Sequence, residues 1–361
     1  MVHGASAQDM FSGTKPVDEK HAFDEASLLD WMHAHVEGFE GPMSVRQFKG
    51  GQSNPTFKIV TATHAYVLRR KPPGKLLPSA HAVDREYKVI AALYPTGFPV
   101  ARPHALCEDE SVIGTMFYVM DHVDGRILWD QTLPDLTPAE RRKTYEAKVK
   151  TFADLHTTDY KKIGLSDFGK EGDYVARQIH RWTKQYQASE TKTIREMDRL
   201  IDWLPANIPP GETTTIVHGD YRLDNMILHP TEPKVIAVLD WELSTLGDPL
   251  ADFTYHLMNW FMPSTDGRGA LADIKDLKAY GIPTHQEYAA LYCEHTGRKG
   301  LPEVDYYFAY NAFRLAAICQ GIVGRVRDGT ASNAAAAQME ARVQPLADFA
   351  YQCAQRAGLE G

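Results

Sequence analysis

The sequence is poor in cysteine, and its few cysteines form no pattern. Four cysteines are scattered through 361 residues, and no two of them have a spacing typical of a metal site. Most lie among apolar or helix-forming neighbours, so we expect buried free thiols rather than a catalytic cysteine. The fifteen histidines include no HExxH spacing, which argues against a zinc site. The cysteines are Cys107, Cys293, Cys319 and Cys353.

Long apolar runs and dense basic runs are also missing. No apolar stretch approaches the roughly 20 residues that a membrane helix needs, and residues 1–19 lack the apolar core of a signal peptide. We therefore expect a cytoplasmic protein with no membrane partner. The net charge is −8 and no dense lysine or arginine run occurs, so nucleic acid is not an expected partner. A hydrophobic content of 43% is ordinary for a globular protein with a large core.

The apolar patterns divide the chain into a strand-rich part and a helical part. Strand patterns occur at residues 44–48, 56–61, 66–69 and 116–120, whereas most of the chain after Thr137 favours helices. Strands followed by helices indicate an α+β fold rather than a doubly wound sheet. The predicted helices are 24–37, 83–94, 137–156, 174–187, 190–204, 304–327 and 334–357.

The stretch 216–242 carries the chemistry. Its two apolar runs flank a Pro-containing turn, which predicts a β-hairpin. Folding this hairpin about Glu232 places Asn225 opposite Leu239, and therefore next to Asp240. We expect both polar side chains at the same open end of the hairpin.

A second carboxylate reaches the same end, because Asp220 lies in the loop that feeds the first strand. Hard cations such as Mg²⁺ take oxygen ligands, usually one or two protein carboxylates together with substrate phosphates. A further carboxylate close to the metal can accept the proton of an attacking hydroxyl. The alternative is a surface hairpin with chance polar residues.

These motifs resemble those of a kinase family. The His-Gly-Asp at 218–220, with Asn225 five residues after the aspartate, resembles the kinase catalytic loop, and Leu-Asp-Trp at 239–241 resembles the metal-binding Asp-Phe-Gly. Residues 247–253 are also similar to that superfamily. The chain resembles the aminoglycoside phosphotransferase and choline-kinase-like family, in particular the kinase-like domain attached to some acyl-CoA dehydrogenases. The resemblance covers most of the chain.

The resemblance implies a protein-kinase-like bilobal fold, with a small antiparallel sheet in the first lobe and a larger helical second lobe. The implied N-terminal nucleotide-binding lobe is 1–120, with a flexible segment at 1–20. A hinge at 121–125 then leads to a helical catalytic and acceptor lobe at 126–361.

The resemblance also implies an ATP- and Mg²⁺-dependent kinase that phosphorylates a hydroxyl of a small molecule. Asp220 is then the general base, and Asn225 and Asp240 are the metal ligands. Arg69 stands where kinases carry a lysine that holds the donor phosphates, and Arg keeps the charge while gripping phosphate with a bidentate fork. Glu86 is its expected partner, although a solvated charge beside Arg85 and Lys88 would look the same.

Nucleotide contacts are expected at two further places. A glycine pair between two strands allows close approach of a phosphate, although a plain hairpin turn would have the same sequence. The resemblance implies that the hinge contacts the edge of the adenine through the Asp121 carbonyl and the Val123 amide. The residues of the phosphate loop are Gly50, Gly51, Ser53 and Asn54.

The acceptor is expected to be anionic. Arg314 and Arg325 are eleven residues apart and share one face of a late helix, where Gly321 and Gly324 leave room. Arginines suit a carboxylate or phosphate group, whereas ordinary salt bridges are the alternative. The resemblance favours a hydroxyacyl-CoA over an aminoglycoside.

Asp248 is a further candidate for the acceptor site, and its alternative is to brace the catalytic loop together with Asp252. Arg222, two residues after Asp220, suggests a phosphate or loop contact. Two other functions are open: a nucleotide-binding pseudokinase that acts as an interaction module, and a metal-dependent phosphohydrolase. The intact base and metal positions argue against the pseudokinase. The sequence does not indicate an oligomeric state.

Overall fold

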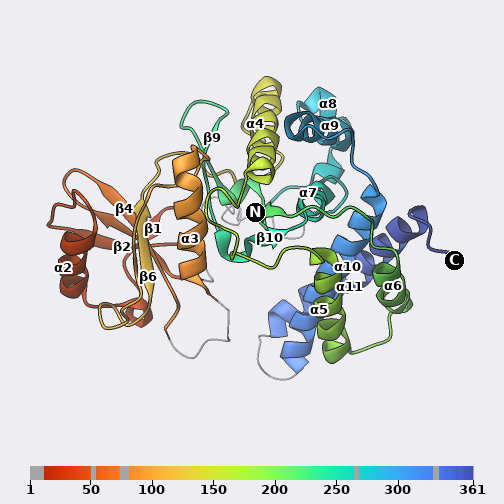
Figure 1. Ribbon diagram of the computed structural model, residues 1–361, viewed down its shortest axis with the longest axis horizontal. Coiled ribbons are helices and arrows are strands. Elements are labelled where there is room, and N and C mark those ends of the chain that lie inside the picture. The colour runs from red at the N-terminus through yellow and green to blue at the C-terminus, as the bar shows by residue number, and fades with distance from the viewer. Residues whose placement is uncertain (1–11, 50–53, 74–80, 264–267, 328–332, 361) are drawn as a thin grey trace, which may run out of the picture. The chain divides into compact units, whose positions relative to one another are not determined.

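The computed structural model describes residues 12–49, 54–73, 81–263, 268–327 and 333–360 (Figure 1). Their packing divides the chain into two compact units. The first unit consists of Met1–Phe168, His218–Ser244 and Phe261–Tyr292, and the second of Gly169–Val217, Thr245–Trp260 and Cys293–Gly361. The predicted lobe boundary at the hinge stays a prediction.

A six-stranded antiparallel sheet forms the beginning of the first unit, in the order β1-β2-β3-β4-β6-β5. Side chains alternate between the two faces of a strand, so one face can pack on α2 (Glu25–His35) and the other on α3 (Val83–Leu93), as Figure 1 shows. Trp31 and Met32 of α2 join the apolar core of the first face. The strands are β1 (Thr14–Lys15), β2 (Ser44–Phe48), β3 (Thr56–Val60), β4 (Ala65–Arg70), β5 (Pro103–Cys107) and β6 (Phe117–Asp121).

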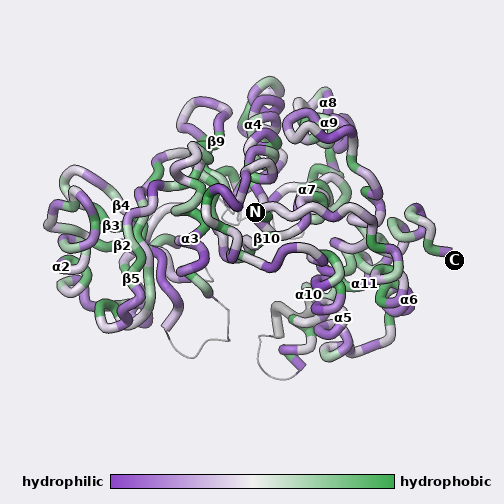
Figure 2. The backbone as a smooth tube through the Cα atoms, in the orientation of Figure 1, coloured by the Kyte–Doolittle hydropathy of each residue, from purple (hydrophilic) through white to green (hydrophobic). Residues whose placement is uncertain are grey.

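The first unit continues with α4 (Pro138–Thr157) and the hairpin of β8 (Met226–Leu228) and β9 (Val235–Val238). Hydrophilic and hydrophobic residues alternate along α4 (Figure 2), as expected for a helix that buries one face. The capping box that opens α4 is present, because Thr137 accepts from the Glu140 amide and Glu140 accepts from the Thr137 amide. The unit also contains 3₁₀ turns and short helices: η1 (Glu19–His21), η2 (Tyr94–Thr96), η3 (Leu223–Asn225), η4 (Trp241–Leu243), η6 (Leu271–Asp273), α8 (Leu277–Tyr280) and the start of α9 (His285–Thr296).

The second unit is helical apart from one strand pair. Its central helix α10 packs against α11, α5 and α7, with Tyr306, Tyr310 and Phe313 of α10 fully buried. The predicted helix at 190–204 begins five residues later than expected, at Arg195. The elements are α5 (Tyr174–Ser189), α6 (Arg195–Ala206), β7 (Thr215–Val217), β10 (Thr245–Gly247), α7 (Pro249–Leu257), η5 (Met258–Trp260), α10 (Val304–Arg327) and α11 (Asn333–Arg356).

Two sequence predictions need correction. The first apolar run of the catalytic stretch is not one strand: Thr215–Val217 pairs with β10, and only Met226–Leu228 pairs with β9. The segment 1–20, expected to be flexible, contributes Thr14–Lys15 to the sheet as β1, while residues 1–11 lie outside the described part. The predicted α+β class is confirmed.

The sequence predicts free cysteines and no membrane-spanning helix. All four cysteines are free thiols; Cys107, Cys319 and Cys353 are buried and Cys293 is half-buried. Among the described residues, no helix combines the length and apolar character needed to cross a membrane.

Candidate active site

The β8–β9 hairpin has the register that the sequence predicts. Met226 pairs with Val238, and the Leu239 amide donates to the Asn225 carbonyl at 2.8 Å. Asn225 therefore lies opposite Leu239, and Asp240 follows directly after it. The hairpin backbone thus fixes both residues at its open end.

Asp220 is held against Asn225. The Asn225 side-chain amide donates to the Asp220 carbonyl at 2.9 Å and to its carboxylate at 3.1 Å, and Arg222 pairs with the same carboxylate oxygen at 3.0 Å. Burial raises the pKa of Asp220, and the charge of Arg222 works against that rise. The loop therefore holds a carboxylate whose affinity for a proton is increased.

Arg69 joins the sheet to this hairpin. Its Nε lies 2.7 Å from the Glu86 carboxylate on α3, and its Nη2 donates to Asp240 at 2.8 Å. The expected pair of Arg69 with Glu86 is thus formed, and Asp240 extends it. Burial lowers the pKa of Arg69, but Glu86 and the neighbouring acidic groups outweigh this and raise it above its usual range. Burial raises the pKa of Glu86 to about 7, against the opposing charge of Arg69.

Two backbone positions in this stretch are conformationally demanding. Asp240 adopts a left-handed backbone conformation with φ 61°. This conformation is costly for a residue other than glycine, and residues that adopt it cluster at functional sites. Gly219 has φ 83°, and a Cβ atom there would lie 2.9 Å from the Leu243 Cβ. The glycine of the His-Gly-Asp motif is therefore required by the fold of the loop.

His218 braces the loop through two hydrogen bonds. Its Nε2 lies 2.9 Å from the Leu239 carbonyl, and its Nδ1 accepts from the Asp220 amide at 3.2 Å. The imidazole thus connects the Asp220 loop to the strand that leads into Asp240.

Asn54 supports Glu86 through its side chain, and its expected contact with nucleotide stays a prediction. Its amide nitrogen donates to the Glu86 carboxylate at 2.8 Å, and its amide oxygen lies 2.9 Å from Nδ1 of His81. Asn54 is fully buried, so its described contacts are internal. Tyr118 donates to the other Glu86 oxygen at 3.2 Å. The remaining residues of the predicted phosphate loop, Gly50, Gly51 and Ser53, lie outside the described residues.

The predicted hinge begins where β6 ends. Asp121 is the last residue of β6, and the backbone on both sides of it is paired, because its amide donates to the Arg102 carbonyl and the His122 amide donates to the Ala65 carbonyl. Val123 is half-buried just beyond the strand. The adenine contacts of Asp121 and Val123 stay a prediction.

Sequence reasoning missed two basic residues beside the catalytic loop. Arg268 lies 3.1 Å from the carboxylate of Asp224, which also contacts Arg222 at 3.5 Å. Lys148 of α4 is buried, and its burial lowers its pKa to about 7. Arg222 was singled out by its place after the motif, but Arg268 and Lys148 are distant in sequence and no local pattern marks them.

The arginines proposed for the acceptor lie on α10 in the second unit. The Arg314 guanidinium lies over the rings of Tyr255 and Trp182, 5.0 and 5.9 Å from their centroids. Arg325 is exposed near the end of the helix. Arg314 is thus engaged with aromatic rings, and a role of either arginine in the acceptor site stays a prediction.

The expectation that Gly321 and Gly324 leave room is wrong. A Cβ atom on Gly321 would lie 2.4 Å from the Gln185 side chain, and one on Gly324 would lie 2.6 Å from the Ser189 Cβ. Both neighbours belong to α5. The glycines therefore allow α5 and α10 to pack closely, and the space that they provide is filled.

Asp248 has a structural role in its own unit. It is the N-cap of α7, where its carboxylate accepts from the Leu250 amide at 2.6 Å and the Ala251 amide at 3.1 Å. Tyr307 of α10 donates to its second oxygen at 3.2 Å. With 1% of its surface exposed, Asp248 braces α7, and the structure gives no support to an acceptor contact.

The chain matches a known protein-family model. The model of the phosphotransferase enzyme family matches residues 44–291, which include the sheet strands from β2 onwards and the whole catalytic stretch. The chain belongs to this phosphotransferase family. It is a phosphotransferase that acts on an alcohol group of a small molecule, and its fold is the protein-kinase-like bilobal fold.

The chain is also similar to a curated relative and to a solved structure. Mouse acyl-CoA dehydrogenase family member 10 is 43% identical over 346 residues, which are 96% of this chain and 32% of that protein. The phosphotransferase thus spans about a third of the length of this relative. A solved structure from Ralstonia eutropha, described as a candidate aminoglycoside phosphotransferase, is 52% identical, has a TM-score of 0.85, and covers 93% of this chain and 99% of its own.

A more distant structure shows the same fold. Spectinomycin phosphotransferase, solved with ADP and spectinomycin, is 12% identical and has a TM-score of 0.59, covering 91% of this chain and 98% of its own. Nucleotide use is a property of this family, and the spectinomycin enzyme holds ADP.

Proposed function

We propose that this phosphotransferase transfers the γ-phosphoryl group of ATP, with Mg²⁺, to a hydroxyl of an anionic metabolite such as a hydroxyacyl-CoA. The observation that carries the proposal is the convergence of Asp220, Asn225 and Asp240 at one end of the hairpin, with Arg69 and Glu86 bound to it. Catalysis of phosphoryl transfer rests on positioning and charge neutralisation, and this network supplies both.

The donor set of the site fits Mg²⁺. Asp240 offers a carboxylate and Asn225 an amide oxygen, and hard cations take such oxygen ligands together with substrate phosphates and water. These two residues would hold the ion, which supplies charge neutralisation for the β- and γ-phosphates when bound. Arg69, which donates to Asp240 at 2.8 Å, would add a positive charge beside the same phosphates.

Asp220 is the proposed general base. As the acceptor oxygen forms its bond to the γ-phosphorus, the hydroxyl proton passes to the Asp220 carboxylate, and the bond to the β–γ bridging oxygen breaks to release ADP. Burial raises the pKa of Asp220, which brings this carboxylate closer to the basicity that proton transfer requires. Asn225 and Arg222 hold the carboxylate in place.

Charges beside Asp220 support an anionic acceptor. Arg222 and Arg268 both contact Asp224, and Lys148 interacts electrostatically with the same carboxylate, so basic groups surround the catalytic loop. A polycationic aminoglycoside would meet repulsion there, whereas a carboxylate or phosphate would be attracted. The similarity to an acyl-CoA dehydrogenase family member points to an acyl-CoA carrying a hydroxyl. Arg314 and Arg325 remain proposed acceptor contacts on α10.

The acceptor is tested by incubating the protein with Mg-ATP and either hydroxyacyl-CoA thioesters or kanamycin-type aminoglycosides, and detecting phosphorylated product by mass spectrometry. We expect phosphorylated acyl-CoA, and a raised KM in an Arg268→Ala variant. Efficient aminoglycoside phosphorylation would overturn the anionic acceptor. ATP binding without transfer to any acceptor would favour the pseudokinase function.

A further inference from the structure

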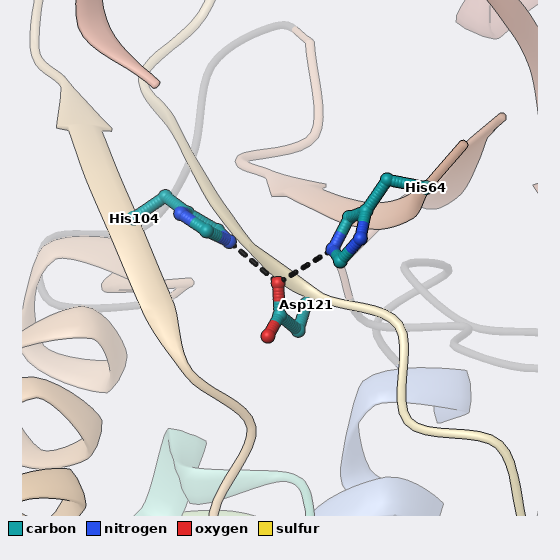
Figure 3. Close-up of side chains that lie close together, drawn as sticks. All are labelled: His64, His104 and Asp121. Atoms are coloured by element: carbon teal, nitrogen blue, oxygen red, sulfur yellow. Dashed lines mark hydrogen bonds and ion pairs between the residues drawn. The ribbon is translucent and has the colours of Figure 1, made fainter. Parts of the chain in front are cut away.

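Three side chains that can bind a metal converge at one end of the sheet. Nε2 of His104 lies 2.6 Å and Nε2 of His64 lies 3.0 Å from the same carboxylate oxygen of Asp121. Figure 3 shows both imidazoles pointing at this oxygen from opposite sides. The three potential ligand atoms all lie within 4.8 Å of one another.

The three residues come from neighbouring strands that fix their positions. His104 is in β5, Asp121 ends β6, and His64 immediately precedes β4, while β6 lies between β4 and β5 in the sheet. The ring of Tyr66 packs against both imidazoles, with centroid distances of 4.5 Å to His64 and 5.3 Å to His104. Ligands carried by paired strands and held by packing are preorganised, which is what a metal site needs.

The donor types select a class of ion. Two imidazole nitrogens and one carboxylate oxygen suit first-row transition metals such as zinc, whereas Mg²⁺ and Ca²⁺ prefer all-oxygen sites. Zinc bond lengths of about 2.0–2.2 Å place tetrahedral ligands roughly 3.3 Å apart. To reach this value, the separations of 2.6 and 3.0 Å from the Asp121 oxygen have to widen by up to about 0.7 Å, and the two imidazole nitrogens, which lie within 4.8 Å of each other, have to close around the ion.

The burial of the ligands leaves one side of the cluster accessible. The side chain of His104 is 7% exposed, that of Asp121 is 27% exposed, and that of His64 is 46% exposed. An ion can therefore enter beside His64, and water can occupy the fourth position. Three protein ligands with an open position are the arrangement of an accessible rather than a closed structural zinc site.

We propose that His64, His104 and Asp121 form a binding site for a divalent transition metal ion of the zinc class. The site is separate from the Mg²⁺ site proposed at Asn225 and Asp240, and it does not depend on the acceptor. An ion there connects the turn before β4 to β5 and to the end of β6, where the predicted hinge begins. No local motif marks this site, because successive ligands are 40 and 17 residues apart in the chain.

The test is calorimetric titration of Zn²⁺ into the full chain with excess Mg²⁺, which occupies all-oxygen sites without competing for imidazole. We expect one site per chain. Exposed His64→Ala and isosteric Asp121→Asn should each weaken the affinity at least tenfold, since even loss of an outer-shell partner costs roughly 10–100-fold. His180→Ala, an exposed histidine on α5, is the matched control and should bind as the wild type does.

Two further measurements distinguish a loss of metal binding from a loss of folding. Circular dichroism of the metal-free variants shows whether each is folded, and Co²⁺ absorption reports nitrogen coordination directly. Absence of a zinc site in the wild type would overturn the proposal. Equal zinc affinity in folded His64→Ala and Asp121→Asn variants, or an equal loss in His180→Ala, would also overturn it.

Discussion

Arg69 and Arg314 are both largely buried, but their surroundings differ. Arg69 in the first unit contacts the carboxylates of Glu86 and Asp240, whereas Arg314 in the second unit lies over the rings of Tyr255 and Trp182. A guanidinium among carboxylates organises charge for a phosphate, while one on aromatic rings mainly packs. An arginine at a suggestive position in the sequence is therefore informative only when its partners are known.

The largest effect is expected at Asp220, the proposed general base. Asp220→Ala should lower kcat by about 10²–10⁴-fold, the usual contribution of a positioned general base, and leave ATP affinity nearly unchanged. The measurement is kcat with a good acceptor beside an ATP titration. An unchanged kcat would remove Asp220 from the base role.

The difference between Arg69 and Arg314 is tested by removing each guanidinium. Arg69→Ala leaves Glu86 buried without its counter-charge and should lower the free energy of unfolding by about 3–5 kcal/mol. Arg314→Leu keeps an apolar side chain against the two rings and should cost only about 1 kcal/mol, the cation–π contribution. Urea unfolding measures both.

Turnover then separates packing from acceptor binding. Loss of activity with an acyl-CoA acceptor in folded Arg314→Leu, at unchanged ATP affinity, would show that Arg314 binds the acceptor. An equal loss of unfolding free energy in Arg69→Ala and Arg314→Leu would show that the two arginines contribute equally to stability, against this prediction.

A pH effect is expected at Lys148. Burial lowers the pKa of Lys148 from 10.5 to about 7, so between these pH values the unfolded chain binds more protons than the folded one. Stability contributed by this group therefore rises with pH above about 7, by up to about 1.4 kcal/mol per pH unit. The unfolding free energy of the wild type, measured from pH 7 to 9, should rise relative to Lys148→Met. Parallel curves for the two proteins would contradict the lowered pKa.

Local patterns predicted much of the fold and the centre of the site. Hydrophobic periodicity gave most strands and helices, and the motif spacing gave the register of Asn225 opposite Leu239. The pairing of Arg69 with Glu86 was one of two open interpretations, and the structure selects it. These features depend on neighbours in sequence or on a motif with fixed spacing.

The rest depends on contacts between distant segments. Asn54 was assigned to nucleotide because of the glycines before it, and its hydrogen bond to Glu86, 32 residues away, was not predicted. In the sequence, Gly321 and Gly324 suggest open space beside the helix, but α5 packs against both glycines. No local rule states which helix will pack on a glycine, or that Arg268 will reach Asp224.

Asp240 and Asn225 are proposed to hold the metal–nucleotide complex on the hairpin that Arg69 reaches. The most direct measurement is an ATP titration with and without Mg²⁺ in the wild type, in Asp240→Asn, and in Asp159→Asn as an exposed-loop control. We predict that Mg²⁺ strengthens ATP binding in the wild type and in Asp159→Asn, and that Asp240→Asn loses most of this gain because a metal carboxylate is removed. The same Mg²⁺ dependence in Asp240→Asn as in the wild type would contradict the account.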